Sequence, residues 1–225
     1  MIQIRNEEEK DYDIVEEITR KAFYNKYVPG CTEHYLVHIM REHEDFVPEL
    51  DFVAELDGRV IGNIMYTKSR LVDEQGKEKV ILTFGPVSIL PEYQRRGYGK
   101  MLMEHSFRRA KELGYEVVVI FGSPANYVGL GFKSCQKYKV CVETGKYPAA
   151  MLVKELVLGA LDMKTWTLSD SPVMTDTLGG VIGIGLFAVC SKMLGERTVR
   201  ILNILASVGT VVTVVFLVLL IAANM

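Results

Sequence analysis

The chain has 225 residues, enough for one well-packed domain with some length left over. Its formal net charge of −2 at pH 7 and its pI of about 6.1 give no support for nucleic-acid binding. The mean hydropathy of +0.16 is high for a chain with 24% charged residues, so the apolar residues must be concentrated in one segment. The charged N-terminus, MIQIRNEEEKDYD, lacks the features of a secretory signal.

The first elements in chain order are a strand and two helices. Residues 2–5 are predicted to form a short strand. Asn6 and Glu9 have the spacing of a helix cap and its return bond, which predicts a helix through about Phe23. A second helix is predicted over residues 31–43.

The middle of the chain is dominated by strand patterns. Asp57 and Gly58 predict a tight hairpin turn, because both residue types tolerate the positive φ angles that such a turn requires. A helix over residues 99–113 ends at Gly114, and residues 116–121 (EVVVIF) are continuously apolar, as in a strand covered on both faces. The full set of predicted strands is 2–5, 51–55, 59–72, 79–90, 116–121, 133–142 and 150–156. This order predicts an α/β domain with a mixed sheet.

The segment QRRGYG, residues 94–99, lies where a predicted strand gives way to a helix. The first amides of a helix have no internal partner and lie at the positive end of its dipole. Gly97 and Gly99 allow a phosphate to approach the backbone closely, and Arg95 and Arg96 add positive charge. The pattern is neither GxGxxG nor a P-loop, since no GK[ST] follows. Taken alone, it fits an anion site and a tight turn with surface arginines equally well.

Residues 85–132 resemble the GNAT superfamily of acetyl-CoA-dependent N-acetyltransferases. Residues 94–99 match the family's Q/R-x-x-G-x-G/A pyrophosphate loop at every defined position. NYVGLGF, residues 126–132, is similar to a second motif in which a tyrosine lies five residues before a Gly-Phe pair. The resemblance extends more loosely over residues 1–165. It implies a GNAT-like mixed, mostly antiparallel sheet flanked by helices, to which the C-terminal segment adds one or more apolar helices.

The resemblance also implies acetyl-CoA as co-substrate and a set of residues that contact it. The pyrophosphate loop consists of Gln94, Arg95, Arg96, Gly97, Tyr98 and Gly99. The pantetheine arm would lie along the end of the preceding strand, at Val87, Ser88 and Ile89, and would complete backbone hydrogen bonds like an added strand. An ordinary core strand is compatible with the same residues. Asn126 is expected to contact the pantetheine arm or the loop.

Direct attack of a neutral amine on a thioester needs a base, a donor to the carbonyl oxygen and an acid for the leaving thiolate. The resemblance implies that the backbone amide near Ile89 is the donor. Tyr127 sits where the resemblance places the general acid, and a phenol with a pKa of about 10 can protonate a departing thiolate. The alternative is that its ring only packs under the cofactor. The base is not identified: four side chains lie near the loop and the hairpin, namely Glu55, Tyr66, Glu92 and Tyr93, and the resemblance also allows a chain of water molecules in this role. No metal is expected, because the i,i+4 pair His34 and His38 lacks a third ligand.

The chain divides into three predicted segments. Residues 1–168 form the acetyltransferase domain, residues 169–180 a linker rich in turn formers, and residues 181–225 a hydrophobic tail that is a candidate membrane anchor. Residues 201–223 carry no charge and would reach about 35 Å as a helix, which exceeds a hydrocarbon core of about 30 Å. Basic residues precede this span, so the positive-inside rule places the domain in the cytoplasm.

The predicted function is therefore an N-acetyltransferase, tethered to a membrane and facing the cytoplasm, that acetylates a primary amine. Two other readings stay open: an acyl-CoA-binding module without catalysis, and a soluble dimeric enzyme whose tail seals the interface. One span is preferred over two, because a two-span hairpin conflicts with the charge rule. The acceptor, whether a small molecule or a protein, is not determined by these residues.

Overall fold

The computed structural model describes residues 1–26, 30–162 and 164–169. Within these ranges, no helix is both long and apolar enough to cross a membrane. The expected span at residues 201–223 lies outside the described residues, as does the rest of the hydrophobic tail, so the membrane anchor stays a prediction.

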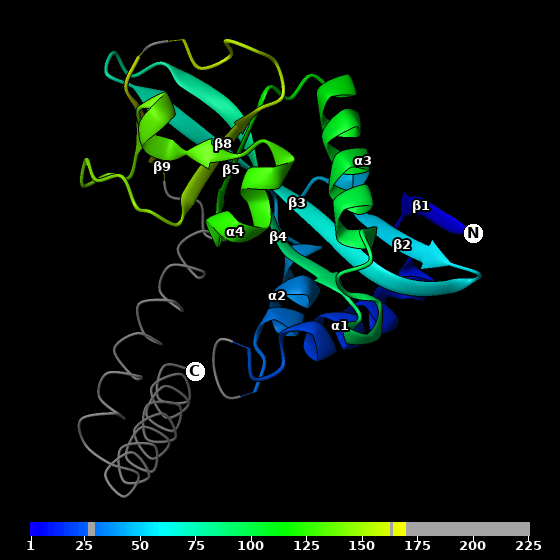
Figure 1. Ribbon diagram of the computed structural model, residues 1–225. Coiled ribbons are helices and arrows are strands. Elements are labelled where there is room, and N and C mark those ends of the chain that lie inside the picture. The colour runs from blue at the N-terminus through cyan, green and yellow to red at the C-terminus, as the bar shows by residue number, and fades with distance from the viewer. Residues whose placement is uncertain (27–29, 163, 170–225) are drawn as a thin grey trace, which may run out of the picture. The chain divides into compact units, whose positions relative to one another are not determined.

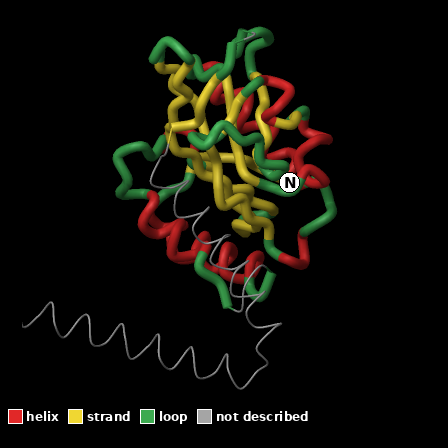
Figure 2. The backbone as a smooth tube through the Cα atoms, turned by 90° about the vertical axis from the view of Figure 1, so that its left-hand side faces the viewer, coloured by secondary structure: helices red, strands yellow, loops and turns green. Residues whose placement is uncertain are grey.

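Within the described residues, a nine-stranded sheet forms the middle of the domain (Figures 1 and 2). The strands are β1 (Ile2–Asn6), β2 (Phe52–Leu56), β3 (Arg59–Asp73), β4 (Glu78–Ile89), β5 (Val117–Phe121), β6 (Lys133–Ser134), β7 (Val140–Cys141), β8 (Met151–Glu155) and β9 (Trp166–Ser169). Their order is β1-β2-β3-β4-β5-β8-β6, and β9 pairs with both β3 and β7. The β4–β5 and β7–β9 pairs are parallel and the others antiparallel, which confirms the mixed, mostly antiparallel sheet.

Helices cover both faces of this sheet. They are α1 (Tyr12–Phe23), α2 (Glu33–Met40), α3 (Tyr98–Glu112) and the short α4 (Pro124–Tyr127). The Ser88 hydroxyl donates to Thr19 Oγ1 of α1 at 3.0 Å, whereas the neighbouring Ile89 faces α3. Successive side chains of a strand point to opposite faces, so α1 and α3 lie on opposite sides of β4 (Figure 1).

Two local predictions about strands are confirmed. Asp57 and Gly58 have φ angles of 49° and 81°, as a two-residue hairpin between β2 and β3 requires. Strand β5 lies between β4 and β8, and its first four residues are buried, as the continuous apolar run predicted.

The predicted helix start at Asn6 is wrong. The chain stays extended through Glu8, and α1 begins only at Tyr12, after a single 3₁₀ turn. The capping box is formed by Glu8 and Asp11, while the Asn6 amide donates to the carbonyl oxygens of Pro48 and Asp51. Because its side chain bonds these distant carbonyl oxygens, Asn6 does not cap the helix as the local pattern predicted.

The predicted strand over residues 133–142 is also wrong. The Ser134 hydroxyl accepts the amide hydrogen of Gln136 and starts a 3₁₀ turn, which ends at Lys139 with a φ angle of 53°. The two remaining short strands then pair with different partners, β6 with β8 and β7 with β9. The parallel partner of β7 is β9, a strand that the sequence did not predict.

Candidate active site

Strands β4 and β5 separate beyond a single point of pairing. They meet at Leu82 and Val118, yet β4 continues to Ile89 beside β3 alone. The Leu90 amide donates to the Ile61 carbonyl oxygen at 2.8 Å. Hydrogen-bonded and non-hydrogen-bonded pairs alternate in an antiparallel ladder, so the main-chain groups of Val87 and Ile89 face away from β3. Among the described residues, no strand occupies that side, which leaves an open edge.

Ser88 does not belong to this open edge. The same alternation directs its main-chain groups toward Asn63 on β3. Its side chain is buried and donates to Thr19, whose hydroxyl in turn contacts Asn63 Oδ1 at 3.3 Å. The structure therefore separates Ser88 from Val87 and Ile89, although the sequence grouped the three as contacts of the pantetheine arm.

The loop of residues 94–99 presents a row of main-chain donors. Arg95 and Gly97 have φ angles of 63° and 89°, and this left-handed geometry around the turn makes a concave nest of amides. Within the described part of the chain, no acceptor takes the amide hydrogens of residues 95–100, and Met101 is the first to bond back, to the Gly97 carbonyl oxygen. Gln94 Nε2 donates to the Ile89 carbonyl oxygen at 2.8 Å, so Gln94 ties the loop to the end of β4.

The charge at this loop is positive. In the ranges that the structure describes, neither Arg95 nor Arg96 forms an ion pair with a carboxylate. The Arg96 guanidinium lies 5.7 Å from the centroid of the Tyr93 ring, which supports its side chain by a cation–π contact. Arg59 contacts the same ring, but its charge is balanced by Glu92 at 3.2 Å. The donors and the uncompensated charge suit an anionic group such as a pyrophosphate.

Tyr127 ends α4 beside the gap between β4 and β5. Its ring centroid lies 5.9 Å from that of Phe84 on β4 and 5.8 Å from that of Phe132. The ring also lies against Gly122, the first residue after β5. Asn126 is exposed, and its main-chain amide donates to the Ser123 carbonyl oxygen. Tyr127 is therefore held by residues from both strands that border the gap.

All four side chains considered as a base are engaged elsewhere, and for Tyr93 the hydroxyl accepts a hydrogen bond from Arg59 Nη1 at 3.5 Å. Glu55 accepts a hydrogen bond from Arg5 Nε at 2.9 Å, and Glu92 pairs with Arg59. Tyr66 is fully buried with its hydroxyl 2.7 Å from Ser106 Oγ, and burial raises its pKa. The described residues contain no group of three or more metal-ligating side chains.

Gly62 on β3 is a site residue that sequence reasoning missed. A Cβ there would lie 2.3 Å from Ile89 Cδ1 and 2.6 Å from the Ser88 carbonyl oxygen. Only a glycine lets β3 approach the end of β4 this closely. The signal in the sequence was a lone glycine inside a strand pattern.

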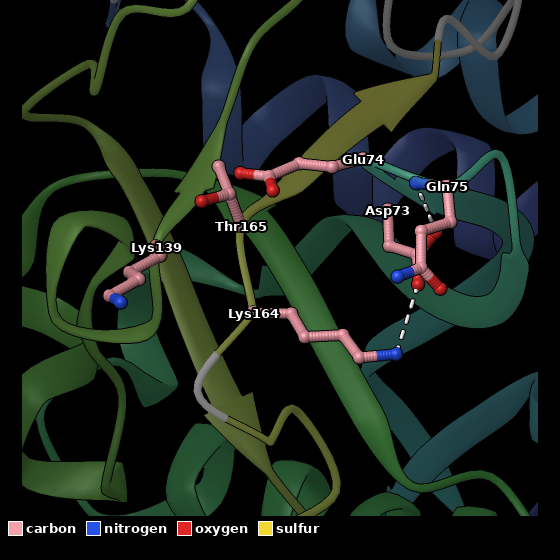
Figure 3. Close-up of a pocket in the computed structure, with 6 residues that line it drawn as sticks. All are labelled: Asp73, Glu74, Gln75, Lys139, Lys164 and Thr165. Atoms are coloured by element: carbon pink, nitrogen blue, oxygen red, sulfur yellow. Dashed lines mark hydrogen bonds and ion pairs between the residues drawn. The ribbon is translucent and has the colours of Figure 1, made fainter.

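A polar pocket of about 210 Å³ lies at the opposite end of β4 (Figure 3). Its lining residues are Asp73, Glu74, Gln75, Lys139, Lys164 and Thr165. Asp73 accepts hydrogen bonds from the amides of Gln75 and Lys77 and from Lys164 Nζ. The carboxylate is thus used to fold the β3–β4 hairpin, and this pocket is separate from the loop at residues 94–99.

Comparison with known proteins agrees with this geometry. The model of the acetyltransferase (GNAT) family matches residues 17–132. The uncharacterized N-acetyltransferase YjhQ of Escherichia coli (strain K12) is 26% identical over 129 residues, which span 57% of this chain and 67% of that protein.

Two crystal structures share the fold. The GNAT family N-acetyltransferase YhbS from Escherichia coli, in complex with CoA, superimposes with a TM-score of 0.66 and 24% identity, over 77% of this chain and 92% of that chain. A GNAT family acetyltransferase from Brucella melitensis, in complex with acetyl-CoA, superimposes with a TM-score of 0.59 and 24% identity, over 77% of this chain and 98% of that chain.

The fold and the family match together define the class: this chain belongs to the acetyltransferase (GNAT) family. That membership makes it an enzyme of the acyltransferase class.

Proposed function

We propose that the chain binds acetyl-CoA along the open edge of β4 and at residues 94–99, and transfers the acetyl group to a primary amine by direct attack in a ternary complex. The observation that carries this proposal is the juxtaposition of unbonded loop amides with an unpaired strand edge. The CoA and acetyl-CoA bound to the two related structures support the choice of ligand.

Different groups of the chain bind the pyrophosphate and the pantetheine arm of the cofactor. The amides of residues 95–99, with Arg95 and Arg96, hold the pyrophosphate. Val87 offers main-chain groups to the amides of the pantetheine arm, as an added strand would use them, and the Ile89 amide faces the thioester end of the cofactor. Gln94 acts through the loop, because its side chain is bonded to the Ile89 carbonyl oxygen. Asn126 lies exposed on α4 and reaches the arm from that side.

Acetyl-CoA supplies an acetyl group activated as a thioester. The Ile89 amide faces the gap and donates to the carbonyl oxygen as the amine attacks and that oxygen gains negative charge. Tyr127 donates its proton to the sulfur as the carbon–sulfur bond breaks. The amine loses one proton to solvent water, because all four side chains considered as a base are already bonded or buried. The Tyr127 phenolate regains its proton from solvent water, so one proton is released and one taken up in each turnover.

Replacing Tyr127 tests catalysis apart from binding. Tyr127→Phe should lower kcat by about 10²- to 10⁴-fold, since one positioned acid is lost. The Kd of acetyl-CoA, measured by calorimetry, should stay the same. Tyr115→Phe, at the other end of β5, is the matched control and should change neither quantity. Equal turnover in Tyr127→Phe and the wild type would refute the acid, and binding without turnover of any amine would favour an acyl-CoA-binding module.

The acceptor is a primary amine of unassigned class. A library of small amines, lysine peptides and free peptide N-termini, assayed by release of the CoA thiol, identifies it. Thiol release without acetylated product would show hydrolysis instead of transfer.

We also propose, from the uncharged sequence of residues 201–223, that the C-terminus anchors the enzyme to a membrane with the domain on the cytoplasmic side. The full-length chain should pellet with membranes and need detergent, whereas a chain ending at residue 170 should stay in the supernatant. A full-length chain that is soluble and dimeric would favour the tail as an interface.

A further inference from the structure

We propose that Gly122 is a positioning residue for Tyr127: its bare Cα lets the phenol ring lie on the backbone at the end of β5, beside the gap between β4 and β5. The inference rests on the proposed function of Tyr127 and adds the residue that fixes its place. No motif in the sequence pointed to Gly122.

The ring and the glycine are in close contact. A Cβ built on Gly122 would lie 2.5 Å from Tyr127 Cε2, 3.1 Å from Cδ2 and 3.5 Å from Cζ. The first two distances are shorter than van der Waals contact allows, so a methyl group and the ring cannot occupy their present positions together. The φ angle of Gly122 is not in the left-handed region, so the position needs a small residue and not an unusual backbone.

The backbone at Gly122 cannot easily retreat. Its amide donates to the Ala150 carbonyl oxygen at 2.9 Å, and this bond continues the pairing of β5 with β8 at Phe121 and Met151. The ring, for its part, is bordered by Phe84 and Phe132. A methyl group at Gly122 must therefore push the ring outward, by about 1 Å to reach ordinary contact.

A displacement of this size matters for proton transfer and little for binding. A catalytic group that moves by about 1 Å can lose about 10²-fold in rate. The loop amides and the open edge of β4 are built from other residues, so affinity for acetyl-CoA does not depend on Gly122. Gly122→Ala should accordingly lower kcat by about 10²-fold with an unchanged KM for acetyl-CoA.

A double-mutant cycle separates this role from a merely structural one. With the best amine from the library as acceptor, Gly122→Ala should lower kcat in the wild type and have no further effect in a Tyr127→Phe background. Gly129→Ala is the matched control, because a Cβ there meets nothing within 4 Å. The same fold-loss in both backgrounds would overturn the proposal, as it would show that Gly122 does not act through the hydroxyl.

Tyrosine ring NMR gives a readout that needs no acceptor. The signal of Tyr127 is the one of the 11 tyrosines that disappears in Tyr127→Phe. Gly122→Ala should shift that signal and leave the signal of Tyr12, on α1, in place, whereas Gly129→Ala should shift neither. An unmoved Tyr127 signal would overturn the inference. If no amine is acetylated by the wild type, the proposed function fails, and this spectrum alone decides whether Gly122 holds the ring.

Discussion

The carboxyl group of Asp51 makes the stability of the domain depend on pH. Asp51 is 5% exposed and the Glu7 side chain beside it is fully buried. Arg41 donates to both carboxylate oxygens of Glu7, at 2.8 and 3.1 Å. Burial, and next a hydrogen bond to Glu7, raise the pKa of Asp51 to about 10. The folded protein therefore holds a proton at Asp51 that the unfolded chain releases near pH 4.

The sign of the effect follows from linkage. A folded state that binds more protons than the unfolded state loses stability as the pH rises. For one proton the slope is about 1.4 kcal/mol of unfolding free energy per pH unit, over the range between the unfolded pKa of 3.8 and the folded pKa of about 10. Between about pH 5.5 and about pH 8.5, the loss amounts to about 4 kcal/mol.

Asp51→Asn removes the slope, because an amide is neutral at both pH values and can donate to Glu7 as the protonated acid does. The assay is urea unfolding of both proteins at the two pH values. The variant should gain about 4 kcal/mol relative to the wild type on going from the lower to the higher pH. Asp13→Asn, an exposed aspartate on α1, is the matched control and should leave the wild-type slope intact. Parallel pH profiles of Asp51→Asn and the wild type would refute the reasoning.

Two further predictions concern packing near the site. Gly62→Ala should cost about 1–3 kcal/mol and weaken CoA binding, because its Cβ would lie 2.6 Å from the Ser88 carbonyl oxygen; thermal unfolding and calorimetry test this, and values that match Gly129→Ala would contradict it. Ser106→Ala should cost about 1–3 kcal/mol by leaving the buried Tyr66 hydroxyl without its partner, whereas Tyr66→Phe should cost less, since Ser106 still bonds a main-chain carbonyl. Urea unfolding compares the two, and equal losses would exclude the hydroxyl pair as the cause.

Features encoded by a few neighbouring residues could be predicted before the fold was known. Local stereochemistry and periodicity predict three such features. They are the positive φ angles at Asp57 and Gly58, the covered strand at residues 116–121, and the turn of residues 94–99 into α3. The resemblance to the acetyltransferase family also rests on short motifs of neighbouring residues, and the family match confirms it.

Only the tertiary structure decided which groups face the gap. Val87, Ser88 and Ile89 are alike as a strand sequence, and the register with β3 turns Ser88 away from the open edge. Arg5 bonds Glu55 from a separate strand, 50 residues away, so no local pattern could exclude that carboxylate as a base. Such facts depend on strand register and on long-range hydrogen-bond partners, which no local pattern encodes because they are fixed only when distant segments pack together.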